Sequence, residues 1–505
     1  MKKLYILIIL ISCFKTQSQV VLIPDVNFKL MLLNNNSVNL NSDNEIQVSE
    51  AVLVTDLDVY AGNIDSLSGL EYFTALQIFN CSYNNLTSIN EISGLTNLTV
   101  LDCNSNNITV LDPVYNLTNL TWLDCSFNQF NILNFVGLPN LQTLNCLGDT
   151  CVTITFNGQN SLKKLLCSGI FTTIDISGLL ALEDASCGSI NLSAINVGIT
   201  GLKKLEVIEN QLQSLDVTNL IFLEELNCSN ALISSLLLGN KPNLKILGCQ
   251  YNLLTNLDIS GAPNLREFNC RFNQLTNLNI AGFTNLIYLV CNNNLLISVN
   301  TNIFNASLKV FHCFNNNLTA LNTGVLCGLT ELFCYNNAIT SLDLQCSSSI
   351  TKLYCDNNQL ADLSIKNNSI ESELFFDGNS NLQHICADAA QLTAVQNKVI
   401  AYGYTNCVVD SACSLSTTNP NSNLDFSIYP NPSNGRFTIN YNNLDLNNSI
   451  NLSVIDMQGR IVYAKENAIT QQKTEINSEN VLKAGVYFVK IYSNNFEKIV
   501  KIVVE

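Results

Sequence analysis

The chain has very little histidine, the residue that most often transfers protons in enzymes near neutral pH. Its 505 residues include two histidines, one tryptophan and three methionines. The histidines, His312 and His384, lie in unrelated settings, and no glycine-rich phosphate loop or serine-elbow motif is present. His384 and Cys386 could form a metal-binding pair, but a place beside a structural disulfide is favoured. The sequence therefore predicts a protein that is not an enzyme.

Charged residues are also scarce, at 13% of the chain, and acidic residues outnumber basic ones by 40 to 24. Residues 425–505 contain eight basic and eight acidic side chains, so the excess of −16 lies upstream of Asp425. The negatively charged part of the chain before Asp425 would repel the phosphate backbone of a nucleic acid, and no cluster of basic residues compensates for this repulsion. Nucleic acid is therefore excluded as a partner.

Long hydrophobic runs are absent except at the N-terminus. Residues 1–19 begin with two lysines after Met1, continue with an apolar run and end in polar residues, which predicts a secretory signal peptide cleaved near Gln19. An alternative reading makes Cys13 the acylated cysteine of a lipoprotein. No other stretch is long and apolar enough to span a bilayer. We expect a secreted or cell-surface protein that can associate with the outer-membrane exterior.

Cysteine, in contrast, recurs with a fixed period. Successive gaps are 20 to 22 residues, with Val207 standing at the one missing position, and this regularity indicates stacked repeats. Extended to Val59 and Phe376, the series has sixteen rungs. The cysteine ladder consists of Cys81, Cys103, Cys125, Cys146, Cys167, Cys187, Cys228, Cys249, Cys270, Cys291, Cys313, Cys334 and Cys355.

The repeat pattern L-x-C-x-x-N-x-L-x-x-L resembles the leucine-rich repeat of short bacterial type, with cysteine in one leucine position. The alternation leucine-x-cysteine places both side chains on one face of a short strand. The asparagine three residues later, as in Asn84 or Asn252, is expected to bond buried backbone groups. The resemblance implies a mainly β solenoid over residues 57–385, with a parallel sheet on its concave face. At about 4.8 Å per strand it would be roughly 70 to 75 Å long.

Residues 20–56 lack the repeat and predict an N-terminal cap that begins with a helix after Asp25. Residues 39–50 resemble an EF-hand loop, although Asn39 replaces the usual first aspartate and Asn44 the glycine. The resemblance implies weak calcium binding, and the alternative is a polar turn before a short helix. Apart from this calcium, no cofactor is expected. The candidate calcium ligands are Asn39, Asn41, Asp43, Glu45 and Glu50.

The repeat pattern ends after Phe376. The sequence of residues 386–413 predicts a C-terminal cap with a helix from about Leu392 to Ile400. Cys386 and Cys407 flank this helix and are the expected disulfide, while Cys413 stays ambiguous. Cys327 and Cys346 are a weaker candidate pair. Ladder thiols should remain free, because parallel Cβ vectors keep neighbouring Cβ atoms about 4.8 Å apart, beyond the roughly 3.8 Å of a disulfide.

A Ser/Thr/Asn/Pro-rich linker is expected at residues 414–424, followed by a small β-sandwich at residues 425–505. The last 80 or so residues resemble the C-terminal sorting domain of the type IX secretion system of Bacteroidetes. The resemblance implies that the type IX machinery carries the protein across the outer membrane, followed by anchoring or release. Its matching elements are Y-P-N-P with Gly435, V-x-D-x-x-G-R at 454–460 and L-x-A-G-V-Y at 482–487.

Aromatic side chains at outward positions of the late rungs form the candidate binding site, because clustered solvent-facing aromatics mark contact surfaces. The alternative is that a cap loop or a neighbouring domain covers them. We predict that the concave face binds a protein or glycan ligand, as in adhesion. The alternatives are a glycan-binding accessory factor and a passive surface-layer component. The candidate ligand-binding residues are Tyr288, His312, Phe314, Phe333, Tyr335, Tyr354 and Phe375.

Overall fold

The structure is a computed structural model, and the chain divides into two compact units, Met1–Cys413 and Ser414–Glu505. The expected signal peptide (except Gln19) and the expected linker lie outside the described residues. So do Cys13 and a few short stretches of the chain. The described residues are 19–148, 150–188, 191–198, 201–301, 307–413, 425–442, 450–456, 461–469, 473–477, 482–493 and 496–504.

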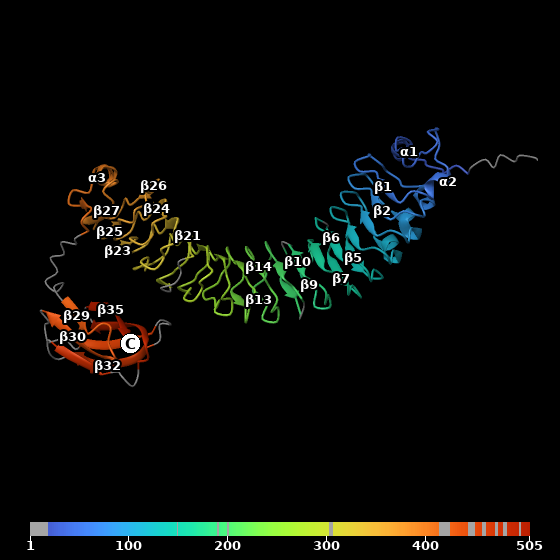
Figure 1. Ribbon diagram of the computed structural model, residues 1–505. Helices are drawn as coiled ribbons and strands as arrows, with labels where there is room; N and C mark the ends of the chain where they lie inside the picture. Colours follow the sequence, from blue (N-terminus) through green and yellow to red (C-terminus); the bar gives the residue numbers. More distant parts are fainter. Residues whose placement is uncertain are drawn as a thin grey trace, which may run out of the picture. The chain divides into compact units, whose positions relative to one another are not determined.

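The first unit is a curved solenoid whose inner face is one parallel sheet of sixteen strands (Figure 1). This confirms the sixteen predicted rungs. Neighbouring strands pair in register, so equivalent residues of successive repeats form straight columns across the sheet. In spatial order the strands are β1 (Asp56–Asp58), β2 (Ile78–Asn80), β3 (Val100–Asp102), β4 (Trp122–Asp124), β6 (Thr143–Cys146), β8 (Lys164–Cys167), β10 (Asp184–Cys187), β12 (Lys204–Glu206), β14 (Glu225–Asn227), β16 (Ile246–Gly248), β17 (Glu267–Asn269), β19 (Tyr288–Val290), β21 (Val310–His312), β22 (Glu331–Phe333), β24 (Lys352–Tyr354) and β26 (Glu373–Phe375).

Every cysteine of the ladder is buried, and none of them is in a disulfide. The apolar residue two positions before each cysteine is buried on the same side, as the strand alternation predicts. Burial raises the pKa of Cys228 to about 12 and holds the pKa of Cys249 well above its ordinary value. The ladder therefore acts as a column of small apolar core residues.

The asparagine column satisfies backbone groups that the solenoid buries. Nδ2 of Asn273 donates to the carbonyl oxygens of Cys249 and Cys270, at 3.0 and 3.1 Å. Its Oδ1 accepts a hydrogen bond from the backbone N–H of Leu254 at 3.0 Å. One side chain thereby bonds its own rung and the preceding one, which is why a buried polar residue is stable here.

The convex side changes along the solenoid. The first three repeats turn through short 3₁₀ helices, and most of the later repeats use short strands instead. The 3₁₀ helices are η1 (Leu70–Tyr72), η2 (Asn90–Gly94) and η3 (Asp112–Asn116). The outer strands pair as β5 (Ile132–Phe135) with β7 (Thr153–Phe156), β9 (Thr173–Asp175) with β11 (Ala194–Asn196), β13 (Ser214–Asp216) with β15 (Ser235–Leu237), β18 (Asn277–Asn279) with β20 (Ser298–Asn300), and β23 (Ser341–Asp343), β25 (Asp362–Ile365), β27 (His384–Ala387) and β28 (Val408–Asp410) in one sheet.

One convex core position carries a lysine. Lys241 occupies the repeat position that Leu220 and Ala262 fill in the neighbouring repeats, and it is fully buried. Its Nζ donates to the carbonyl oxygens of Thr218 and Asn240, at 3.2 and 3.4 Å. Burial lowers the pKa of this ammonium group, although Asp216 opposes that effect.

Helices close the N-terminal end of the solenoid. Helix α1 (Val26–Leu33) begins after Asp25, whose side chain accepts a hydrogen bond from the Phe28 N–H at 2.9 Å. Helix α2 (Val48–Ala51) follows the EF-hand-like loop. Phe28 and Leu32 are fully buried and pack into the same core as the first rungs. Among the described residues, no helix is long and apolar enough to cross a membrane.

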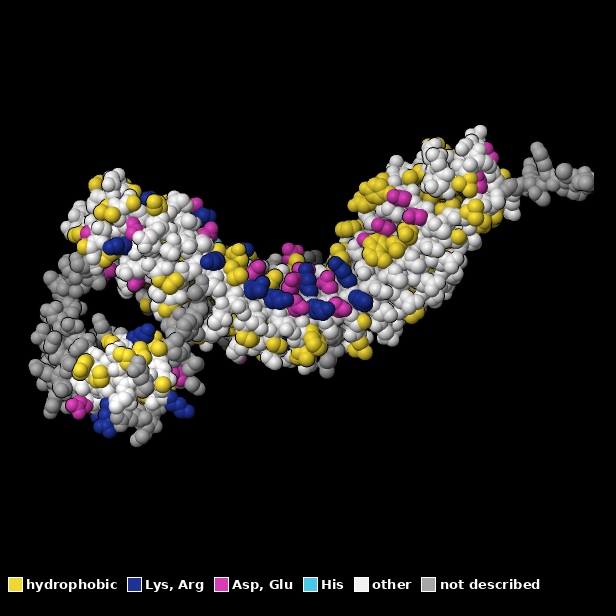
Figure 2. Space-filling view, in the orientation of Figure 1, with side chains coloured by type: hydrophobic (Ala, Val, Ile, Leu, Met, Phe, Trp, Pro, Cys, Tyr) yellow, Lys and Arg dark blue, Asp and Glu magenta, His cyan; other side chains and the backbone are white. Residues whose placement is uncertain are grey.

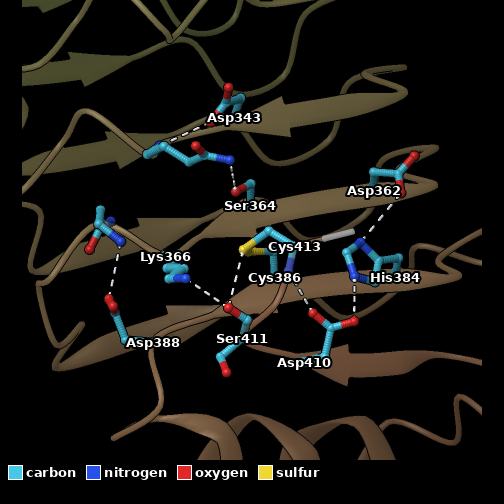
Figure 3. Close-up of a disulfide and its surroundings, with 12 residues drawn as sticks. Asp343, Asp362, Ser364, Lys366, His384, Cys386, Asp388, Asp410, Ser411 and Cys413 are labelled. Carbon is cyan, nitrogen blue, oxygen red and sulfur yellow. Dashed lines mark hydrogen bonds and ion pairs between the residues drawn. A yellow bond between two sulfur atoms is a disulfide. The ribbon is translucent and has the colours of Figure 1, made fainter. Parts of the chain in front are cut away.

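The C-terminal cap corrects one disulfide prediction. Cys386 on β27 is bonded to Cys413, not to Cys407, with a Cα–Cα distance of 5.0 Å (Figure 3). The register of β27 and β28 places Cys386 opposite Asp410, and the chain then turns back so that Cys413 reaches it. Cys407 directly precedes β28, and its buried thiol is not in a disulfide. The weaker candidate pair, Cys327 and Cys346, is bonded.

In the sequence, helix α3 (Leu392–Ala401) comes between β27 and β28, and its side chains Val395 and Val399 are buried. The helix agrees with its predicted position. Side chains around the disulfide are linked to backbone groups of the cap: Lys366 Nζ donates to the Ser411 carbonyl at 2.7 Å, and Asp410 accepts from the Cys413 N–H at 2.8 Å (Figure 3).

The second unit consists of two antiparallel sheets around one core, which is the predicted sandwich. Phe437 and Ile439 of the first sheet pack with Val454 and Val489 of the second. One sheet contains β29 (Asp425–Tyr429), β30 (Arg436–Asn442) and β33 (Lys473–Asn477). The other contains β32 (Ile461–Ile469), β31 (Ile450–Ile455), β34 (Gly485–Ser493) and β35 (Phe496–Val504).

Candidate functional site

Six of the seven predicted aromatic-site residues form two rows on the concave face of the last rungs. The first aromatic row runs along the position just before the ladder residue: His312 stacks on Phe333 at 4.3 Å between centroids, and Phe333 stacks on Tyr354 at 4.4 Å. Phe375 ends this row with an edge contact to Tyr354 at 4.7 Å. The rows follow from the in-register pairing of β21, β22, β24 and β26.

The second aromatic row occupies the position just after the ladder residue. Phe314 and Tyr335 stack there at 4.4 Å, with ring planes 10° apart. Tyr288 joins neither row, because it lies two strand positions earlier, opposite Val310 of the next strand. It is 46% exposed and stands alone.

The rows are open to solvent over part of their surface. His312, Phe314, Phe333, Tyr335 and Tyr354 are each half-buried, mainly by one another, and Phe375 is 42% exposed. The C-terminal cap reaches only the end of the first row, where Lys398 Nζ lies 5.3 Å from the Phe375 ring centroid. Within the described residues of this unit, the cap therefore leaves most of the aromatic surface accessible.

A polar column borders the first row. Glu331 lies 3.0 Å from Lys352 Nζ and 3.5 Å from Nε2 of His312, and the Tyr354 hydroxyl donates to Glu373. Burial lowers the pKa of His312, and Glu331 opposes this shift. His312 is thus held largely neutral near pH 7.

An asparagine ladder borders the second row, and the sequence reasoning missed it. Asn315 Nδ2 donates to Asn293 at 2.9 Å, and Asn336 Nδ2 donates to Asn315 at 2.7 Å. These residues have positive φ values of 52° to 55°, a conformation that asparagine tolerates. Their recurrence two positions after the ladder cysteine is the signal that could have identified them.

The middle of the concave face carries alternating charges that neutralise one another (Figure 2). Lys203 pairs with Glu183 at 2.7 Å and Lys245 with Glu224 at 2.6 Å. Lys204 lies 3.3 Å from Glu206. This neutral belt separates the aromatic rows from the N-terminal rungs.

The EF-hand-like loop satisfies much of its own hydrogen bonding. Glu50 accepts from the backbone N–H groups of Leu40, Asn41 and Gln47 at 2.9 to 3.1 Å. Asp43 accepts from Asn41 and Gln47 side chains, both at 2.9 Å, and backbone hydrogen bonding by Glu45 lowers its pKa.

The two other candidate calcium ligands, Glu45 and Asn39, differ in whether their side-chain oxygens already have a bonding partner. Glu45 pairs with Lys29 at 2.6 Å. Asn39 is 5% exposed, and its Oδ1 has no hydrogen-bond partner, so it is the one buried oxygen here with an open coordination site. Calcium binding at the loop stays a prediction.

His384 does not form a metal pair with Cys386, whose sulfur is in the disulfide. Its Nε2 lies 3.2 Å from Asp410, and its Nδ1 lies 3.7 Å from Asp362 (Figure 3). Among the described residues, no group of three or more histidine, cysteine or acidic side chains is arranged to hold a metal ion.

Comparisons with known proteins agree with this architecture. Residues 74–116 match the family of leucine-rich repeats in two copies, and residues 427–505 match the secretion system C-terminal sorting domain. No curated protein matches the chain in sequence. Together these results establish a leucine-rich-repeat solenoid followed by a sorting domain, and the domain implies export to the cell surface or beyond.

Solved structures resemble the solenoid in fold. The functional domain of InlJ from Listeria monocytogenes, which includes a cysteine ladder, matches with a TM-score of 0.56 and 23% identity, covering 97% of this chain and 99% of that one. YopM from Yersinia enterocolitica matches with a TM-score of 0.49 and 21% identity, covering 71% and 78%. At such identities the likeness concerns the fold.

Proposed function

We propose that this exported leucine-rich-repeat protein is a non-enzymatic binding protein that recognises a protein ligand through its two aromatic rows. The observation that carries the proposal is the continuous, part-exposed aromatic surface over β21, β22, β24 and β26. Rings of this kind are expensive to leave in water and dominate the energy of many protein interfaces.

The stacking geometry favours a protein over a glycan. Most rings of successive rungs lie nearly parallel, at 1° for His312 and Phe333 and 10° for Phe314 and Tyr335, and only Phe375 at the end of the first row is turned, by 70°. Their faces are therefore turned toward each other, and mainly their edges meet solvent. A sugar that stacks needs an open ring face, whereas protein aromatic and carbonyl groups contact ring edges favourably.

The polar residues on either side of the aromatic rows can fix the orientation of a bound protein. Glu331, Lys352 and Glu373 lie along one side of the rows, and the asparagine ladder lies along the other. An apolar centre with polar edges is the usual anatomy of a protein interface. The sorting domain accounts for delivery of this surface to the cell exterior.

The proposal is tested by binding the mature protein to an array of extracellular proteins and a panel of glycans. Simultaneous replacement of Phe314, Tyr335 and Tyr354 by Ala should lower affinity for the ligand at least 10-fold, since aromatic anchors contribute about 1 kcal/mol or more each. The matched control replaces Tyr83, Tyr251 and Phe272, exposed aromatics of earlier rungs, by Ala.

Binding that falls equally in both triple variants would place the ligand elsewhere. A ligand found only on the glycan panel would support the accessory-factor alternative. If no ligand binds and the protein instead forms ordered assemblies, it is a surface-layer component. A cooperative thermal transition in each variant shows that loss of binding is not loss of fold.

A further inference from the structure

A second exposed column on the concave face lies far from the aromatic rows, over the N-terminal rungs. Ile78, Val100 and Trp122 occupy equivalent positions on β2, β3 and β4 and are register neighbours. Ile78 is 41% exposed, and Val100 and Trp122 are half-buried. Successive side chains stand about 4.8 Å apart across the sheet, so they form one continuous apolar strip.

An acidic column runs beside this strip, two strand positions further along. It contains Asp58 on β1, Asp102 on β3 and Asp124 on β4. Burial raises the pKa of Asp102, and the charges of Asp124 and Asp58 raise it further. The three carboxylates therefore act on one another and create a negative potential along the strip.

The segment that builds these rungs contains no cation to balance that potential. Between Lys29 and Lys163 the chain has twelve acidic residues and no lysine, arginine or histidine, so this stretch has a net charge of −12 out of −16. Lys29 is paired with Glu45 in the cap. On the sheet, the first cation in the column of Trp122 is Lys164, two strands away, and it lies 3.5 Å from Asp184.

Figure 2 shows the result as a surface. Hydrophobic and acidic side chains gather over the N-terminal strands, and lysines and arginines begin only in the central rungs. We define the N-terminal patch as Ile78, Val100 and Trp122 with Asp58, Asp102 and Asp124.

We propose that the N-terminal patch is a second docking site, which binds a polypeptide segment that combines apolar side chains with lysine or arginine. The apolar side chains of the segment pack on Ile78, Val100 and Trp122. Its lysine or arginine side chains pair with the carboxylates of the acidic column beside this strip. Charge complementarity selects this partner, because an anionic or phosphorylated segment would be repelled by Asp58, Asp102 and Asp124, and residues 30–162 supply no cation to offset that repulsion. The site lies beyond the proposed function, which concerns the aromatic rows at the other end of the sheet.

Trp122 is the only tryptophan in the chain, so its fluorescence reports on this site in the full protein. The probe is a blocked synthetic peptide of three Lys-Leu-Ser repeats, added to the mature full-length protein. Glu-Leu-Ser and Lys-Ser-Ser peptides of equal length are the controls. We expect a saturable shift of Trp122 emission with the first peptide, at least 5-fold weaker binding of the Lys-Ser-Ser peptide and no binding of the Glu-Leu-Ser peptide.

Replacement of Asp102 and Asp124 by Asn removes charge and keeps the acceptor oxygens for their turn N–H groups. This double variant should lower affinity for the Lys-Leu-Ser peptide about 10-fold. The matched control, Asp356→Asn with Asp377→Asn, changes two acidic residues of the late rungs and should have no effect. Ile78→Ser should weaken binding with every carboxylate intact.

Equal responses to the lysine and glutamate peptides, or unchanged affinity in the Asp102 and Asp124 variant, would overturn the proposal. A saturable emission shift with calcium chloride alone, abolished by the same variant, would reassign the patch as a cation site. The triple aromatic variant of the late rungs should bind the peptide normally. Failure of one site is thereby distinguishable from failure of the other.

Discussion

Nδ2 of Asn106 donates a hydrogen bond to the carbonyl oxygen of Cys81 in the preceding rung, at 3.0 Å. The same side chain donates to the Cys103 carbonyl at 3.2 Å and accepts from the Leu86 N–H at 3.0 Å. Three buried backbone groups in two successive repeats thus depend on one amide.

Replacement of Asn106 by Ala should lower the free energy of unfolding by about 3 kcal/mol, since each unsatisfied buried group costs about 1 to 3 kcal/mol and water can recover part of this. Urea unfolding followed by circular dichroism measures the change. The exposed neighbour Asn107 is the control, and its replacement by Ala should cost about 0.5 kcal/mol or less. Equal losses in the two variants would contradict a special role for the column.

Replacement of Lys241 by Leu should stabilise the solenoid by about 1 to 2 kcal/mol at pH 7, because it removes a buried ammonium group with only two carbonyl partners. The pKa of Lys241 is lowered in the folded state, so the unfolded chain binds more protons between that pKa and the ordinary value of 10.5. Stability of the wild type therefore rises with pH through this window.

Ladder thiols such as Cys81 and Cys228 oppose that rise, because burial raises their pKa values in the folded state and stability therefore falls above pH 9. The difference between wild type and Lys241→Leu isolates the lysine, since both proteins share the ladder. This difference should shrink as pH approaches 10.5. A constant difference from pH 7 to 10.5 would show that the pKa of Lys241 is the same in the folded and the unfolded state.

Alkylation separates the free cysteines from the disulfides. In the native protein the ladder thiols should resist iodoacetamide, because they are buried and protonated. After denaturation without reductant, mass spectrometry should find all thirteen ladder cysteines alkylated. Peptides should remain linked as Cys327–Cys346 and Cys386–Cys413. A Cys386–Cys407 peptide would restore the original sequence prediction.

Calcium at residues 39–50 should bind in the range of about 0.1 to 1 mM, as expected of a loop with few carboxylates. Glu50→Ala is a poor test, since Glu50 bonds three backbone N–H groups of the loop. Asp43→Asn keeps a similar shape and removes one charge, so it should abolish the calorimetric heat. Heats that are absent in the wild type, or unchanged in the variant, would remove the site.

Deletion of residues 425–505 should leave a folded solenoid, because the second unit has its own core. The truncated protein should keep the thermal transition of the first unit and should accumulate inside the cell envelope. Immunofluorescence on intact cells and fractionation measure this. Surface display that survives the deletion would favour the lipoprotein alternative through Cys13.

The repeat architecture could be predicted from the sequence because each rung repeats the same local physics. Strand alternation, a buried cysteine and a bonded asparagine recur often enough to fix the number of rungs. The disulfide could not be predicted in the same way. Whether Cys386 meets Cys407 or Cys413 depends on the register of β27 with β28, and no repeat determines that register.

The surface chemistry was predicted only in part. The sequence predicted solvent-facing aromatic residues at the positions next to the ladder cysteine, and six of those residues do lie in rows. Ser82 and Ser126 occupy equivalent positions, but they are 2% exposed, because each hydroxyl bonds to the side chain two residues earlier. The column of Ile78, Val100 and Trp122 lies two strand positions earlier, outside the consensus, and was missed.

Both disulfides lie in the last rungs and the cap, and this placement has a mechanical consequence. A rung of 21 residues that is pulled out of the solenoid can lengthen to about 70 Å. Cys327–Cys346 closes 19 residues of sequence and Cys386–Cys413 closes 27, so tension cannot extend those segments. When a bound partner pulls on the protein, the uncrosslinked N-terminal rungs are the part that can unravel to their full length, while these two segments near the aromatic rows keep their ends together.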